Sequence, residues 1–74
     1  MNRRPIYLTR HGVQRALGYD LSSEEVEKMI SDGERKVEGK TKAGYALRSK
    51  RGVWVAICEE CRDQIIVLAI RKGR

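Results

Sequence analysis

Apolar residues in the first part of the chain recur at helical spacing. Val13, Ala16 and Leu17 follow the three- and four-residue intervals that place side chains on one face of a helix. Thr9 is a favourable N-cap residue for this segment, and Gly18 suits its end. We therefore expect a short first helix between these two residues, with its apolar stripe facing the core.

A second helix has sharper start and stop signals. Ser22 followed three residues later by Glu25 forms the pattern of a capping box, and Gly33 provides a stop. Acidic residues in the first turn also suit the positive end of the helix dipole. The expected buried stripe of this helix consists of Val26, Met29 and Ile30.

Beyond Gly33 the apolar positions alternate with a period of two, which is typical of strands. Four strands are predicted, at 34–39, 44–49, 53–58 and 63–71, and residues 6–8 are expected to form a short extended segment. The short turns favour antiparallel neighbours. The predicted fold class is α+β: a two-helix hairpin packed on a three- to four-stranded antiparallel sheet. We expect a single domain over residues 1–74, with residues 1–5 as a flexible arm.

The last two predicted strands are apolar on both faces. Two short helices can cover only one face, so we expect an exposed patch centred on Trp54 and its neighbours, covered by the N-terminal arm, a homodimer mate or a partner chain. By strict alternation, Val53, Val55 and Ile57 oppose Trp54, Ala56 and Cys58, while Ile65, Val67 and Ala69 oppose Ile66, Leu68 and Ile70.

The chain is strongly basic. Sixteen Lys and Arg against ten Asp and Glu give a formal charge of +6, which favours nucleic acid, an anionic surface or an acidic protein as partner. The apolar run 65–70 is far shorter than the roughly 18 residues that cross a bilayer, and the N-terminus lacks the apolar stretch of a signal peptide. We therefore expect a cytoplasmic protein without a membrane partner.

His11 and Arg15 form the first candidate for chemistry. His11 is the single histidine of the chain, and the four-residue spacing puts both side chains on one helix face. In a ribonuclease, His11 would act as general acid or base, while Arg10 and Arg15 would stabilise charge on phosphorus without a metal or other cofactor. In the alternative reading, His11 caps a turn or packs on the sheet and Arg15 pairs with a glutamate of the second helix.

Basic and aromatic residues farther along the chain are candidates for nucleic-acid binding. Arg48, Lys50 and Arg51 bracket the predicted turn between the second and third strands, where three cations close together could clamp a phosphate backbone. The expected phosphate contacts are Arg48, Arg51 and Arg71. Tyr45 could stack on a base. The alternative is an ordinary solvated basic surface, with Tyr45 covering the edge of the sheet.

Cys58 and Cys61 have the spacing of half a zinc knuckle. A closed site would need His11 or a second chain to supply the remaining ligands. We predict no metal site, and favour a hairpin turn whose cysteines are reduced or locally bridged.

The chain resembles a family of small domains of unknown function that are similar to the BrnT and RelE toxins. The resemblance rests on the pattern Tyr7, Thr9, Arg10, His11, Arg15, Leu21, Ser22 and Val26, followed by the apolar strand 65–68. It implies the two-helix and antiparallel-sheet fold, and cleavage of messenger RNA restrained by an antitoxin. The family's arginine before the second helix is absent here, where the chain reads Gly18, Tyr19 and Asp20.

The function expected from these observations is that of a toxin-like RNA-acting protein of the BrnT/RelE type, acting as a metal-independent endoribonuclease. Its expected partners are RNA and an antitoxin-like protein or a homodimer mate. The alternative is a non-catalytic module that binds nucleic acid or protein.

Overall fold

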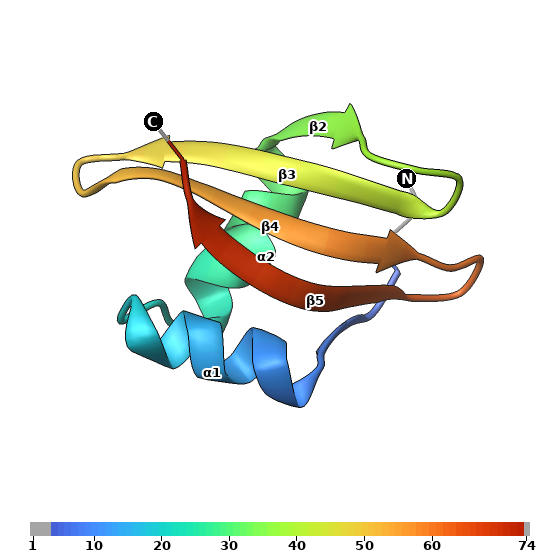
Figure 1. The fold of residues 1–74 in the computed structure, drawn as a ribbon, viewed down its shortest axis with the longest axis horizontal. Helices are drawn as coiled ribbons and strands as arrows, with labels where there is room; N and C mark the ends of the chain where they lie inside the picture. The colour runs from blue at the N-terminus through green and yellow to red at the C-terminus, as the bar shows by residue number, and fades with distance from the viewer. Residues whose placement is uncertain (1–3, 74) are drawn as a thin grey trace.

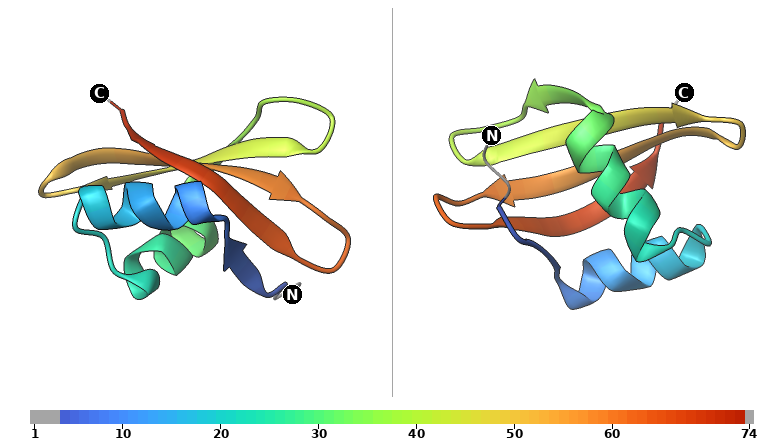
Figure 2. Two further views of the ribbon diagram at one scale, coloured as in Figure 1. Left: turned by 60° about the horizontal axis from the view of Figure 1, so that its bottom comes forward. Right: turned by 180° about the vertical axis from the view of Figure 1, so that it is seen from behind.

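The computed structural model describes residues 4–73, which form a five-stranded sheet with two helices packed on one of its faces (Figures 1 and 2). The elements follow the chain as β1 (Ile6–Leu8), α1 (Arg10–Gly18), α2 (Ser23–Asp32), β2 (Glu34–Val37), β3 (Lys42–Ser49), β4 (Gly52–Glu60) and β5 (Ile65–Lys72). The α+β class predicted from the sequence is confirmed. No helix within residues 4–73 is both long and apolar enough to cross a membrane.

The sheet is mixed and larger than expected. Its strand order is β1-β5-β4-β3-β2, and every neighbouring pair is antiparallel except β1 and β5, which are parallel. The extended segment expected at residues 6–8 is β1, but the prediction of three or four antiparallel strands did not include it in the sheet. Three residues are too few for their pattern to show which strand they pair with, and β1 joins the sheet because the backbone of β5 provides its hydrogen-bonding partners.

The expected flexible arm lies partly outside the described residues, which begin at Arg4. The last two residues of that arm are held in place. The Ile65 amide donates to the Pro5 carbonyl oxygen at 2.9 Å, and the Arg4 guanidinium donates to the Cys61 carbonyl oxygen at 3.0 Å. Arg4 and Pro5 thus continue the line of β1 past the turn between β4 and β5.

Both helix starts are as predicted. The Thr9 hydroxyl accepts from the Gly12 amide at 3.1 Å, and Ser22 and Glu25 form a complete capping box. Gly33 follows the last residue of α2, and Val26 and Met29 are each 1% exposed. Local capping and side-chain spacing were sufficient to predict these features.

The buried stripe of α1 differs from the prediction. Ala16 is buried, but Val13 and Leu17 are 42% and 72% exposed, and Gly12 faces the sheet instead. A Cβ atom on Gly12 would lie 2.6 Å from the Val67 carbonyl oxygen, so the helix approaches β5 at a distance that only glycine permits. Because of this close approach, the small residues Gly12 and Ala16 face the sheet, and the larger Val13 and Leu17 are exposed.

Trp54 lies on the helix-covered face, so the expectation of an exposed patch centred on it is wrong. It is 7% exposed and its ring centroid lies 4.7 Å from that of Tyr19. On β5, an irregularity leaves Leu68 without a partner, because Cys58 pairs with Val67 and Ile57 with Ala69. Strict alternation therefore fails beyond Val67, and the residues of β5 that are buried are Ile65, Val67 and Ile70.

The opposite face of the sheet carries Val53, Val55 and Ile57, which are half-buried, and neither of the two described helices covers it. An ion pair between Arg71 of β5 and Glu38 beyond β2, 3.6 Å apart, links the two sides of this face. Homodimerisation or partner binding through this face stays a prediction.

The close approach at Gly12 predicts a sharp difference between two glycines of α1. Gly12→Ala should destabilise the protein by about 1–3 kcal/mol, because the added methyl group meets backbone that cannot move aside. Gly18→Ala is the matched control: its Cβ would meet no atom within 4 Å, and we expect a stability unchanged or raised by up to about 1 kcal/mol. Chemical denaturation measures both effects, and equal stabilities for the two variants would contradict this packing.

Candidate functional site

His11 and Arg15 lie side by side on the surface of α1. The Arg15 Nε donates to the His11 Nε2 at 3.4 Å, and both residues are exposed. Their position follows from the packing of Gly12 and Ala16, since residues 11 and 15 each precede a buried residue by one helical step of about 100°. Arg10, the first residue of the helix, is also exposed. The structure thus brings an imidazole and a guanidinium together within reach of solvent.

The other flank of α1 has a different character. Val13 and Leu17 each follow a buried residue by one helical step, and their side chains are exposed large hydrophobic groups. The helix therefore presents a basic stripe, His11 and Arg15, and an apolar stripe, Val13 and Leu17, on either side of its contact with β5. A polar ligand and an apolar partner could contact this helix at the same time.

The predicted phosphate contacts lie on two sides of the molecule: Arg48 and Arg71 flank β4 on the uncovered face of the sheet, whereas Arg51 reaches the helix side. Arg48 is exposed on β3. Arg51, in the turn between β3 and β4, donates to the Glu25 carboxylate at 3.0 Å and to the Asp20 carbonyl oxygen at 3.3 Å. Arg71 pairs with Glu38. Arg51 and Arg71 therefore already have carboxylate partners within the chain, although both remain accessible to solvent.

Arg51 and His11 lie near opposite ends of α1. His11 is in the first turn, while Asp20, which Arg51 reaches, comes after the last turn of a nine-residue helix about 13 Å long. A ligand contacting both would have to extend along the whole helix. His11 and Arg15 form one basic pair, Arg10 precedes His11 by one helical step at the start of α1, and Arg51 belongs to a different part of the surface.

Tyr45 has a structural position that differs from the one expected of a base-stacking residue. It is 5% exposed on the covered face of β3, and its hydroxyl donates to the Glu60 carboxylate. The same carboxylate accepts from Arg35 at 3.0 and 2.5 Å, and the Arg4 guanidinium lies 3.9 Å away. Burial and the neighbouring Glu60 charge raise the pKa of Tyr45.

Glu60 is the centre of a polar network that the sequence analysis missed. The hydrogen bonds from Arg35, together with the Tyr45 hydroxyl and the positive charges of Arg35 and Arg4, lower the pKa of Glu60 to about 2. The signal was present in the alternation of β4, because Glu60 continues the inward series of Trp54, Ala56 and Cys58. A carboxylate that faces inward is costly unless it is paired. The register of β2, β3 and β4 places Arg35 and the Tyr45 hydroxyl within hydrogen-bond distance of Glu60.

Cys58 and Cys61 lie in different surroundings. Cys58 is buried within β4, whereas Cys61 follows the end of that strand and is partly exposed; both thiols are free. Burial, with a smaller contribution from the Glu60 charge, raises the pKa of Cys58 to about 12. The Cys58 thiol is therefore protonated at neutral pH and forms part of the core.

Comparisons of the chain with family models, with curated proteins and with solved structures found no match.

The low pKa of Glu60 predicts a pH-dependent contribution to stability. In the unfolded chain this carboxyl titrates near its ordinary value of 4.5, so its stabilising effect is complete above about pH 5 and is lost as the pH falls towards 2. Because Arg35 is half exposed and screened, we expect Glu60→Gln to cost about 1–2 kcal/mol at pH 7 and much less at pH 2.

Denaturation of the wild type and the Glu60→Gln variant across this pH range measures the effect. The control is Glu59→Gln, which changes charge by the same amount on the opposite face of β4. A loss of equal size in both variants at every pH would show that the network contributes nothing specific.

Proposed function

We propose that this protein binds RNA and cleaves it without a metal ion, as a toxin-like endoribonuclease of the BrnT/RelE type. The observation that carries the proposal is the exposed pairing of His11 with Arg15 at 3.4 Å, beside Arg10, in the first turns of α1. A titratable imidazole next to fixed cations is a combination suited to chemistry on a phosphodiester.

In the proposed reaction, His11 Nε2 takes the proton of a ribose 2′-hydroxyl. The 2′-oxygen forms a bond to the adjacent phosphorus while the bond to the 5′-oxygen breaks, and that oxygen takes a proton from water. Arg15 and Arg10 stabilise the negative charge that develops on the phosphoryl oxygens. The long hydrogen bond from Arg15 yields readily to substrate, because at 3.4 Å it is weak.

Two further observations support this proposal. The formal charge of +6 favours polyanion binding, and the two-helix arrangement on an antiparallel central sheet agrees with the fold that the family resemblance implies. The proposal places the protein in the cytoplasm, where its RNA substrates are found. It also includes an antitoxin-like protein or a homodimer mate as partner, for which exposed Val13 and Leu17 offer an apolar contact.

A second candidate function is a non-catalytic binding module. The apolar stripe on α1 favours it, since Val13 and Leu17, 42% and 72% exposed, suit a protein contact that needs no chemistry. In that case the basic stripe would serve only to bind nucleic acid. Substitution of His11 separates the two functions, because only an enzyme depends on its imidazole.

We expect His11→Ala to reduce RNA cleavage by about a hundredfold or more while changing RNA affinity by less than about threefold, since general acid–base catalysis contributes 10²–10⁴-fold. Cleavage of a labelled single-stranded RNA in the presence of a chelator, together with binding measured by fluorescence anisotropy, gives both quantities. Gln14→Ala, an exposed substitution on the same helix, is the control. RNA binding without cleavage by the wild type would favour the module.

Binding should depend steeply on salt, because phosphate contacts release counterions. We expect Arg15→Ala to reduce the slope of log affinity against log salt by about 0.7, the value for one phosphate contact on a single strand. Titrations at several salt concentrations measure this slope. A slope near zero, or absence of binding at low salt, would exclude both an enzymatic and a binding role on RNA.

A further inference from the structure

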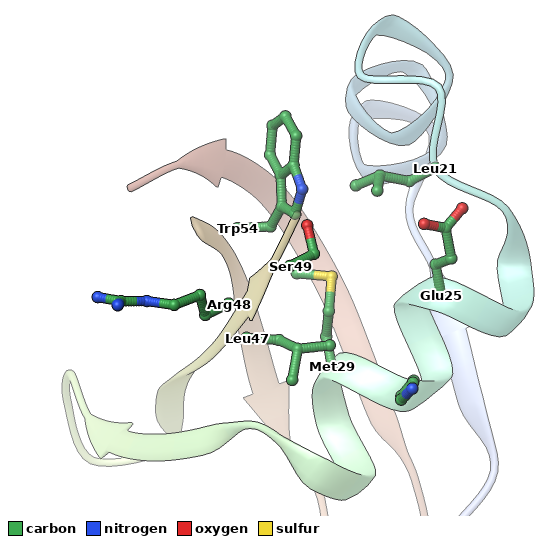
Figure 3. A pocket seen from close by; sticks show the side chains of 8 residues that line it. Leu21, Glu25, Met29, Leu47, Arg48, Ser49 and Trp54 are labelled. Carbon is green, nitrogen blue, oxygen red and sulfur yellow. The ribbon is translucent and has the colours of Figure 1, made fainter. Parts of the chain in front are cut away.

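A pocket of about 270 Å³ lies between α2 and the hairpin of β3 and β4 (Figure 3). Its apolar walls come from Leu21 before α2, Met29 on α2 and Leu47 on β3. This volume is close to the lower limit of about 300 Å³ for small-molecule pockets, so it suits a ligand the size of one aromatic ring with a substituent.

One polar group in the pocket lacks a partner. Trp54 is 7% exposed, and its indole Nε1 is buried without a hydrogen-bond partner among the described residues. Figure 3 shows the indole nitrogen on the side of the ring that faces Leu21 and α2. A buried N–H without an acceptor costs about 1–3 kcal/mol. Because the nitrogen is covered in this structure, the indole has to turn slightly towards the pocket before a ligand acceptor reaches it, and a ligand that supplies this acceptor gains the interaction.

The other polar groups that line the pocket indicate which charge a ligand acceptor should carry. Glu25 is already bonded to Arg51 and to the Ser22 amide, and the Ser49 hydroxyl donates to the Gly52 carbonyl oxygen. Lys28 also lines the pocket and has no carboxylate partner within residues 4–73. The groups left for a ligand, the indole N–H and the Lys28 ammonium, are thus both donors.

The Arg48 guanidinium is not part of this donor set. Arg48 lines the pocket, but Figure 3 shows its guanidinium leading away from the other lining side chains. Two donors and an apolar wall together suit an acceptor that is negatively charged and attached to an apolar body.

We propose that this pocket binds a small carboxylate with an apolar body. One carboxylate oxygen accepts the indole N–H of Trp54, the Lys28 ammonium balances its charge, and the apolar body packs against Leu21, Met29 and Leu47. The site lies on α2 and the hairpin, so it operates independently of the basic stripe on α1.

Benzoate and benzyl alcohol are the probes, since they share a ring and differ in charge. Trp54 is the only tryptophan, so the full chain gives a single indole N–H signal in a ¹H–¹⁵N correlation spectrum. We expect benzoate to shift this signal saturably and benzyl alcohol to bind at least about threefold more weakly, because it lacks the ionic contribution. His11→Ala should bind benzoate like the wild type, which separates this outcome from that of the RNA proposal.

Lys28→Gln should weaken benzoate binding about threefold, whereas Lys36→Gln, an exposed lysine on β2, should leave it unchanged. Trp54→Phe, observed through the benzoate signals, should weaken binding about tenfold by removing the donor. Absence of a saturable indole shift would mean that the pocket holds water only and would overturn the proposal. Equal affinity for both probes, with no effect of Lys28→Gln, would overturn it as well.

Discussion

The contact between the start of α1 and the backbone of β5 organises most of this small fold. The Thr9 amide donates to the Val67 carbonyl oxygen at 3.0 Å, and the Thr9 hydroxyl lies 3.2 Å from the carbonyl oxygens of both Val67 and Leu68. Gly12 then packs directly on the Val67 carbonyl group. Because the backbones meet here without a side chain between them, this contact determines both the height of the helix above the sheet and its rotation about its own axis.

That rotation has consequences for chemistry. With Gly12 and Ala16 against the sheet, His11 and Arg15 are exposed on one flank, and Val13 and Leu17 on the other. The same contact lies at the irregularity of β5, where Leu68 is left unpaired and the strand changes which of its residues face inward. The helix that carries the candidate catalytic group is therefore positioned by main-chain atoms of β5, together with the Thr9 hydroxyl.

A second set of interactions lies two residues farther along β4 than Cys58, the partner of Val67. Glu60 on β4 binds Arg35 on β2 and Tyr45 on β3, and Arg4 approaches it from the segment that precedes β1. One carboxylate thus connects segments from both edges of the sheet. Charge neutralisation matters in this location, since the side chain of Glu60 is only 13% exposed and an unpaired carboxylate there would be costly.

The basic residues of the molecule thus fall into two groups: those paired with carboxylates of the chain and those without such a partner among the described residues. Arg35, Arg51 and Arg71 pair with carboxylates of the chain. Arg10 and Arg15 instead lie on α1 with His11, whose imidazole accepts only the long hydrogen bond from Arg15, and Lys28 lines the pocket beside the unpaired indole N–H of Trp54. A composition rich in Lys and Arg does not by itself distinguish these two groups. The distinction arises from which carboxylates the sheet register and the hairpin turn bring near.

The sequence by itself determined the features that depend on neighbouring residues. These are the two helix starts, the buried stripe of α2 and the approximate positions of β2 to β5, because capping, helical spacing and alternation act over a few residues. The pairing of His11 with Arg15 also followed from their four-residue spacing. The tertiary structure alone decided the rest: β1 as a parallel edge strand, the rotation of α1 onto Gly12, the irregularity at Leu68, and Trp54 beneath the helices. Each of these depends on contacts between segments far apart in the chain, and the close packing of backbone against backbone outweighed the local preference to bury Val13 and Leu17.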